Sequence, residues 1–133
     1  AVDALWATFG LTEEYVRAND SSTIAAESHV TWQREIVEGD PYIITSQVLA
    51  WDDKRIHQFQ RMYHASEGFL AATCEWMNLH FNPALRRVAP WPEEIRARIA
   101  DFTDNQGQHP WPEEAGRQMR IKQPLFSMRP ETL

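Results

Sequence analysis

Glu27 and His29 are the pair of side chains in this sequence best spaced for acid–base chemistry. They lie two residues apart in the segment 23–37, in which apolar and polar residues alternate. Such alternation is typical of a β-strand, where residues i and i+2 point to the same face. His29 could therefore orient a water or a ligand while Glu27 holds its ring. A solvent-facing side of a strand, or a hydrogen-bonded pair at a subunit interface, explains the same pattern without catalysis.

Glu75 is the second residue of interest, because it interrupts the small, apolar, strand-like segment 71–80. A carboxylate in such a segment must have a partner or lie near water. Arg61 and His57, in the segment before it, are the two candidate partners. His80 ends the same segment on the opposite face, so we do not expect it to act directly with Glu75.

Other kinds of site find little support in the sequence. Cys74 is the only cysteine, which excludes an intramolecular disulfide and a cysteine-rich zinc site. The histidines lack metal-ligand spacing, and the chain has neither a glycine-rich phosphate loop nor a nucleophile elbow. A net charge of -6 argues against a nucleic-acid-binding surface. We expect a cytoplasmic protein with no metal, no cofactor, no nucleic-acid partner and no membrane span.

A short helix followed by a series of strands must position these residues. Val2, Leu5 and Phe9 recur at three- and four-residue spacing, which predicts a helix over residues 2–11. Turn residues then separate strand-like segments, at 23–37, 42–51, 55–65 and 69–81. Short polar connections between strands predict an antiparallel meander packed on the helix, which is an α+β fold.

The C-terminal part of the chain has a different character. Trp91-Pro92-Glu93-Glu94 predicts the start of a helix, with proline at its first position and acids in its first turn. Residues 90–94 recur as 110–114, which we interpret as two similar helix starts, with a true repeat as the alternative. Residues 106–133 predict an extended tail along the domain or a partner subunit. We therefore divide the chain into a domain at 1–82 and a C-terminal helix and tail at 83–133 packed on it.

Residues 2–82 resemble the acyl-CoA thioesterases of the hotdog superfamily, in particular the 4-hydroxybenzoyl-CoA thioesterase-like branch associated with carnitine and betaine catabolism. The resemblance rests on the order and spacing of several stretches: Asp3-Ala4-Leu5 before Gly10-Leu11, residues 27–32 with Glu35-Ile36, residues 54–59, and residues 72–80. It implies a hotdog fold, in which an antiparallel sheet wraps around a central helix. It also implies homodimers or homotetrameric dimers of dimers that bind acyl-CoA between subunits.

The same resemblance bears on catalysis. Members of this family carry their main catalytic Asp just before the central helix. The chain starts inside a helical pattern, with no initiator Met and no N-cap, so we expect the first strand, the helix start and this Asp upstream of Ala1. Glu27 and His29 would then be supporting groups.

The resemblance further implies a thioester hydrolase that acts on a short or polar acyl-CoA, such as a betainyl-CoA-like thioester. CoA enters as part of the substrate, and its phosphates require cations. Lys54-Arg55 and Arg86-Arg87 are the basic pairs best placed to bind them, with simple surface solvation as the alternative for each pair.

Tryptophans offer a further possible contact for such a substrate. Trp32, Trp51 and Trp76 could surround a quaternary ammonium group, although packing in the core or at an interface explains them as well. Two other functions stay open: a non-catalytic hotdog module for acyl-CoA binding or oligomerisation, and a cone-shaped α+β domain of the nuclear-transport-factor-like type. The short helical part before residue 23 argues against the second.

Overall fold

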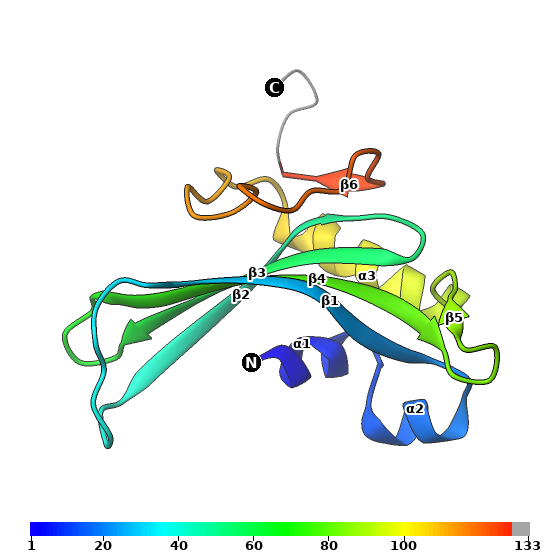
Figure 1. The fold of residues 1–133 in the computed structure, drawn as a ribbon, viewed down its shortest axis with the longest axis horizontal. Helices are drawn as coiled ribbons and strands as arrows, with labels where there is room; N and C mark the ends of the chain where they lie inside the picture. The colour runs from blue at the N-terminus through cyan, green and yellow to red at the C-terminus, as the bar shows by residue number, and fades with distance from the viewer. Residues whose placement is uncertain (129–133) are drawn as a thin grey trace.

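The structure, a computed structural model, describes residues 1–128 as one curved antiparallel sheet with helices and an extended tail packed on it (Figure 1). The end of the predicted tail, residues 129–133, lies outside the described residues. In chain order the elements are α1 (Val2–Thr8), α2 (Glu13–Ala18), β1 (Ser22–Trp32), β2 (Tyr42–Trp51), β3 (Arg55–His64), β4 (Leu70–Asn82), β5 (Arg87–Val88), α3 (Glu93–Gln106) and β6 (Phe126–Ser127).

The strands form a sheet in the order β1-β4-β3-β2-β6, with β5 paired to the end of β4. β2, β3 and β4 follow one another as antiparallel neighbours, as the polar turns predicted. The predicted meander is wrong at its first connection, because β1 pairs with β4 and residues 33–41 cross to β2 as a loop. β1 ends at Trp32, since the next two backbone N–H groups, of Gln33 and Arg34, both donate to the carbonyl of Ala71.

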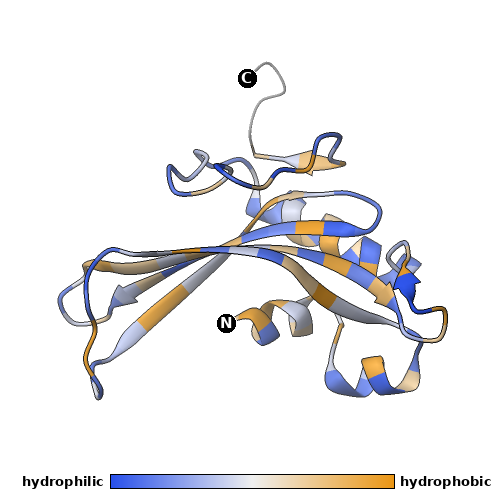
Figure 2. Ribbon diagram, in the orientation of Figure 1, coloured by the Kyte–Doolittle hydropathy of each residue, from blue (hydrophilic) through white to orange (hydrophobic). Residues whose placement is uncertain are grey.

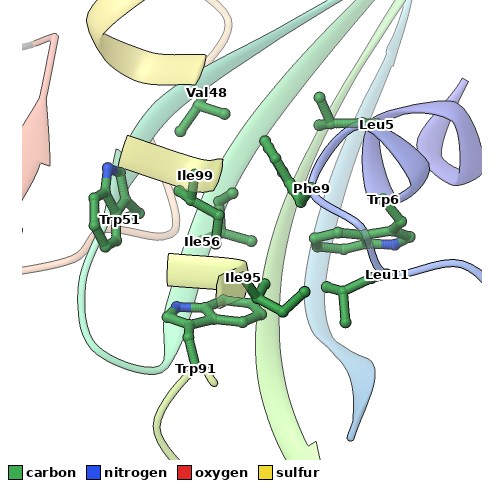
Figure 3. Packing of buried hydrophobic residues seen from close by; sticks show 10 residues of the cluster. All are labelled: Leu5, Trp6, Phe9, Leu11, Val48, Trp51, Ile56, Trp91, Ile95 and Ile99. Carbon is green, nitrogen blue, oxygen red and sulfur yellow. The ribbon is translucent and has the colours of Figure 1, made fainter. Parts of the chain in front are cut away.

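One face of the sheet packs against α1 and α3, whose side chains meet over β2 and β3 (Figure 3). Phe9, just after α1, is fully buried, and its ring meets that of Phe102 edge-on at 5.3 Å. Leu5 is buried and Val2 is partly buried in the same cluster, so the predicted apolar face of the first helix is confirmed. α1 ends at Thr8, earlier than predicted, because the chain turns at Gly10 with a φ of +85°. α3 contributes Ile95, Ile99 and Phe102 to the same cluster.

The other face of the sheet lies under the tail, which runs on the opposite side from α1 (Figure 1). Figure 2 shows that the tail is largely hydrophilic until β6. A few apolar tail residues anchor it in two small clusters: Ala115 and Met128 with Leu49 and Phe59, and Met119 and Ile121 with Ala50 and Met77. Over the residues that the structure describes, the tail therefore lies along the domain.

The repeated Trp-Pro-Glu-Glu sequence adopts two different structures. At Trp91 it leads into α3, and the Trp91 indole N–H donates to the carbonyl of Asp52. At Trp111 no helix follows, which corrects the prediction of a second helix start. There the indole N–H donates forward to the carbonyl of Ala115, and Gly116 follows at a φ of +77°, so the chain closes into a loop.

The two long edges of the sheet differ. Gln106, the last residue of α3, accepts a hydrogen bond from the N–H of Val48 and donates one to its carbonyl, both at 2.8 Å. β6 pairs with the end of the same strand, β2. β1, at the other edge, presents exposed apolar side chains: Ile24, Val30 and Trp32. Within residues 1–128, no helix is long and apolar enough to cross a membrane.

Candidate functional site

Three ionisable side chains from three strands meet on the tail-covered face of the sheet. Oε2 of Glu75 in β4 lies 2.7 Å from Nε2 of His57 in β3, and it accepts the backbone N–H of Gly116 at 3.0 Å. Its other oxygen, Oε1, lies 3.5 Å from Nδ1 of His29 in β1. The side chains of Glu75 and His57 are 0% exposed, whereas that of His29 is 30% exposed. One carboxylate therefore hydrogen-bonds to β3 and the tail and lies beside His29 of β1 without a hydrogen bond to it.

The surroundings of Glu75 determine its charge. Burial favours the neutral acid, but the hydrogen bonds from His57 and Gly116 and the charges of His57 and His29 outweigh burial, so the pKa of Glu75 is lowered. Glu75 is therefore an anion at neutral pH, and His57 donates through Nε2. A fully buried carboxylate with these two donors is held in place and shielded from any bound thioester.

The partner of His29 differs from the predicted one. Glu27 is exposed and makes no ion pair or side-chain hydrogen bond within residues 1–128, and Glu75 occupies the position expected for it. Of the two partners predicted for Glu75, the structure selects His57, because the guanidinium of Arg61 lies over the ring of Phe59 instead. The proposed catalytic roles of Glu27 and His29 stay predictions.

A groove of about 670 Å³ lies at the end of the sheet where the loop 33–41 begins. Met62 and Ala72, which pair across β3 and β4, are among its lining residues, together with Trp32 and Tyr42. Met62 follows Ile56 at even spacing along β3, which places the groove on the α1 side of the sheet, away from His29. Trp32 is 84% exposed and available to a ligand.

The three tryptophans proposed as a cage do not meet. Trp51 is buried in the core, and its indole N–H donates to Oγ1 of Thr103 at 3.3 Å. It pairs with Ile56 next to the β2–β3 turn, at the far end of the sheet from Trp32. Trp76 is half-buried within β4 and does not line the groove. Of the three, the groove includes Trp32 alone.

The two predicted basic pairs differ in how their charges are used. Arg55 donates two hydrogen bonds to Oδ2 of Asp52, at 2.8 and 2.6 Å, so its charge is already neutralised. Lys54, Arg86 and Arg87 form no ion pair within the described part of the chain. Of the two pairs, these three cations are the ones that no acidic side chain of residues 1–128 neutralises.

Both basic pairs lie at the same end of the sheet. The N–H of His80 donates to the carbonyl of Lys54, and the N–H of Ala89 donates to that of His80, which joins the strand ends. Trp32 lies opposite Ala72, eight residues earlier along β4 than His80. At about 3.3 Å per residue this separates the two places by roughly 26 Å. The structure thus brings the basic pairs together but not with Trp32.

Ser21 and His80 form a pair that has the geometry of a nucleophile and its base. Oγ of Ser21 lies 2.7 Å from Nε2 of His80, whose Nδ1 lies 2.9 Å from the carbonyl of Ala89. Both residues are buried, at 1% and 2% exposure. Burial lowers the pKa of His80 in spite of the hydrogen bonds to Ala89 and Pro90. We interpret the pair as structural, because a substrate cannot reach it.

Sequence comparison relates this chain to proteins of known activity. The thioesterase-like superfamily model matches residues 1–99. The betainyl-CoA thioesterase of Pseudomonas aeruginosa is 32% identical over 117 residues, which cover 88% of this chain and 74% of that protein. The L-carnitine dehydrogenase/betainyl-CoA thioesterase of Rhizobium meliloti is 32% identical over 120 residues, which cover 90% of this chain and 24% of that protein. This chain therefore spans about a quarter of that relative.

Comparison with solved structures agrees with the sequence comparison. A hypothetical protein of Staphylococcus aureus, solved in complex with CoA, is similar with a TM-score of 0.82 and 29% identity, covering 90% of this chain and 75% of that one. A putative thioesterase of Pseudomonas putida is similar with a TM-score of 0.71 and 24% identity, with the same coverages of 90% and 75%. Together with the family match, these similarities confirm the predicted α+β hotdog fold.

Proposed function

Because this chain belongs to the thioesterase-like superfamily, we propose that it hydrolyses acyl-CoA thioesters. The observation that carries the proposal is the 32% identity to a betainyl-CoA thioesterase, of which this chain covers 74%. The similarity to a protein solved with CoA supports CoA as the part of the substrate that this fold binds. The proposed reaction uses water and requires no metal or cofactor.

The acyl group that we propose is short and polar, with betainyl as the leading candidate. Its trimethylammonium group carries a fixed positive charge, which aromatic faces attract. The groove offers Trp32 and Tyr42 as aromatic walls, and the carboxylate of Glu35 lies among its lining residues. Arg34 also lines the groove, but its guanidinium stacks on Phe69 at 4.0 Å. These features favour a cationic acyl group over a long aliphatic chain.

The active assembly that we propose is a two-fold dimer joined along β1. An exposed edge strand presents unpaired N–H and C=O groups, which a second copy can pair with. β1 adds exposed Ile24, Val30 and Trp32 to this edge. Because the groove and the free cations Lys54 and Arg87 lie at opposite ends of one sheet, we propose that different copies bind the acyl group and the CoA phosphates.

His29 is the imidazole that we propose as a supporting group. It lies on the edge strand, it is partly exposed, and Nδ1 faces the Glu75 carboxylate, which favours a fixed ring orientation. It lies on the opposite face of the sheet from the groove, both in its own chain and in a copy paired antiparallel along β1, so its proposed effect on turnover is a positioning one through the sheet and not a contact with the acyl group in the groove. Glu27 would contribute through the charge that it adds beside the interface along β1.

Measured thioester hydrolysis tests the proposal. The purified protein should release free CoA thiol from betainyl-CoA faster than from acetyl-CoA or palmitoyl-CoA at equal concentrations. Hydrolysis of none of the three, with CoA still binding in a calorimetric titration, would favour the non-catalytic binding module instead. Preference for palmitoyl-CoA would contradict the proposed acyl group while leaving the reaction class intact.

A further inference from the structure

We propose that residues 111–121, called the clasp below, fasten to the sheet at Glu75 and prevent the face beneath them from stacking on a second copy of the chain. The clasp begins with the second Trp-Pro-Glu-Glu sequence, which has no part in the thioesterase function proposed above. The proposal concerns assembly and is independent of that function.

The fastening point is a buried charge. Glu75 is fully buried in the middle of β4, and within residues 1–128 its Oε2 accepts two hydrogen bonds, from the Gly116 N–H and from His57. An ionised carboxylate out of water needs such donors, since an unpaired buried charge is strongly destabilising. Opening the clasp would remove one of the two donors. The clasp is therefore tied to the sheet at a specific point and not only by apolar contact.

The conformation of the loop that carries the Gly116 N–H directs this N–H toward Glu75. The indole N–H of Trp111 donates to the carbonyl of Ala115 at 3.0 Å, which closes the loop. The Trp111 ring also meets the ring of His57 at 5.8 Å, above the buried pair. Gly116 has a φ of +77°, and a Cβ there would lie 3.0 Å from the Trp111 ring. Glycine is therefore the residue that fits beneath the indole.

The covered surface is apolar, whereas the outer surface of the clasp is charged. Sheet residues Leu49, Ala50, Phe59 and Met77 are each at most 7% exposed, under contacts from Ala115, Met119 and Ile121. Sheets with apolar faces commonly pack face to face. The clasp instead presents exposed charged side chains to solvent, at Glu113, Arg117 and Arg120. A second copy thus meets a charged surface where the bare sheet would offer an apolar one.

Two variants of the full chain open the clasp in different ways. Glu75→Gln keeps the side-chain shape but removes the negative charge that strengthens the hydrogen bonds from Gly116 and His57 to Oε2. Gly116→Ala leaves the sheet unchanged and places a methyl group against Trp111. It therefore still tests the proposal if Glu75→Gln fails to fold. Glu113→Gln removes a charge from the exposed side of the clasp and serves as the matched control.

Trypsin cleavage after Arg117 and Arg120 measures clasp opening, because a protease needs several residues freed from the fold. Both variants should be cut about tenfold to a hundredfold faster than wild type, the scale of losing one buried hydrogen bond to a charged group. Light scattering at equal protein concentration should give them a larger mass than wild type. Glu113→Gln should match wild type in both measurements.

Each outcome decides a part of the proposal. Cleavage of both variants at the wild-type rate would mean that Glu75 does not fasten the clasp. Faster cleavage at an unchanged mass would overturn the role in preventing association. Neither measurement uses acyl-CoA, so a protein that hydrolyses no thioester leaves the outcome of this test unaffected.

Discussion

The groove beside Trp32 leads to a prediction about charge recognition. In Trp32→Ala the aromatic wall is lost, while Trp32→Phe keeps an aromatic face at the same position. Because the Trp32 side chain is 84% exposed, its removal should change the free energy of unfolding by less than about 0.5 kcal/mol. A large change in catalysis in an assembly of unchanged mass therefore reports on the substrate and not on folding or association.

The expected magnitude follows from the exposure of the groove. A cation over an aromatic ring contributes about 0.5–1 kcal/mol when exposed and about 2 kcal/mol when desolvated. Since about 1.4 kcal/mol corresponds to tenfold, losing the contact should lower kcat/KM for a cationic acyl group by roughly twofold to thirtyfold. If the groove stays open to water, the loss in kcat/KM should be nearer twofold. If a second copy covers the groove, the loss should be nearer thirtyfold.

The assay compares two thioesters of the same shape. Betainyl-CoA and tert-butylacetyl-CoA differ only in a quaternary nitrogen that replaces a quaternary carbon. The ratio of their kcat/KM values, from release of free thiol, isolates the charge. Trp32→Ala should lower this ratio by the factor given above, and Trp32→Phe should retain most of it. An equal loss on both substrates would refute charge recognition by Trp32, and no loss on either would remove the groove from the acyl site.

Three further predictions concern catalysis and stability. His29→Ala should lower turnover of betainyl-CoA by about tenfold to a hundredfold, and wild-type turnover in an assembly of unchanged mass would exclude the role. The folded-state pKa of Glu75 is lowered, so its ionised form stabilises the fold at neutral pH, and this contribution disappears as the pH falls through that pKa. Urea unfolding should therefore show a steeper loss of stability in acid for wild type than for Glu75→Gln. Phe9→Ala should cost about 3–5 kcal/mol in urea unfolding, whereas the same change at partly buried Val2 should cost far less.

Local features of the fold were predictable, and long-range pairing was not. The spacing of Leu5 and Phe9 identified the buried face of α1, because helix periodicity depends only on near neighbours. The partner of β1 depends instead on which distant strand it meets. The turn residues 38–41 predicted a hairpin, but β1 already ends at Trp32, so residues 33–41 form a connection long enough to cross β4 and β3, and β1 reaches the outer edge of β4. Alternation alone does not distinguish these two pairings.

The candidate site was predictable to a similar extent. A carboxylate that interrupts an apolar strand predicted a partner for Glu75, and His57 on the neighbouring segment was one of the two candidates. Glu75 also accepts the backbone N–H of Gly116, which lies 41 residues further along the chain. Every residue except proline carries such a group, so residue type gives no signal for this contact. Two copies of one short sequence, at Trp91 and Trp111, also gave different structures, because the residues that follow them differ.

The side chain of Gln106 has a consequence for how far assembly can proceed. Its amide bonds to Val48 as a neighbouring peptide would, and β6 occupies Ala50 and Trp51, so β2 lacks a continuous free ladder to match the 11 residues of β1. Adding copies head to tail would require β1 of one to pair with β2 of the next. In the proposed dimer β1 pairs with β1 of a second copy, which uses both free β1 edges at once. Such a contact would close after two copies and would protect this open-edged sheet from growing into a filament.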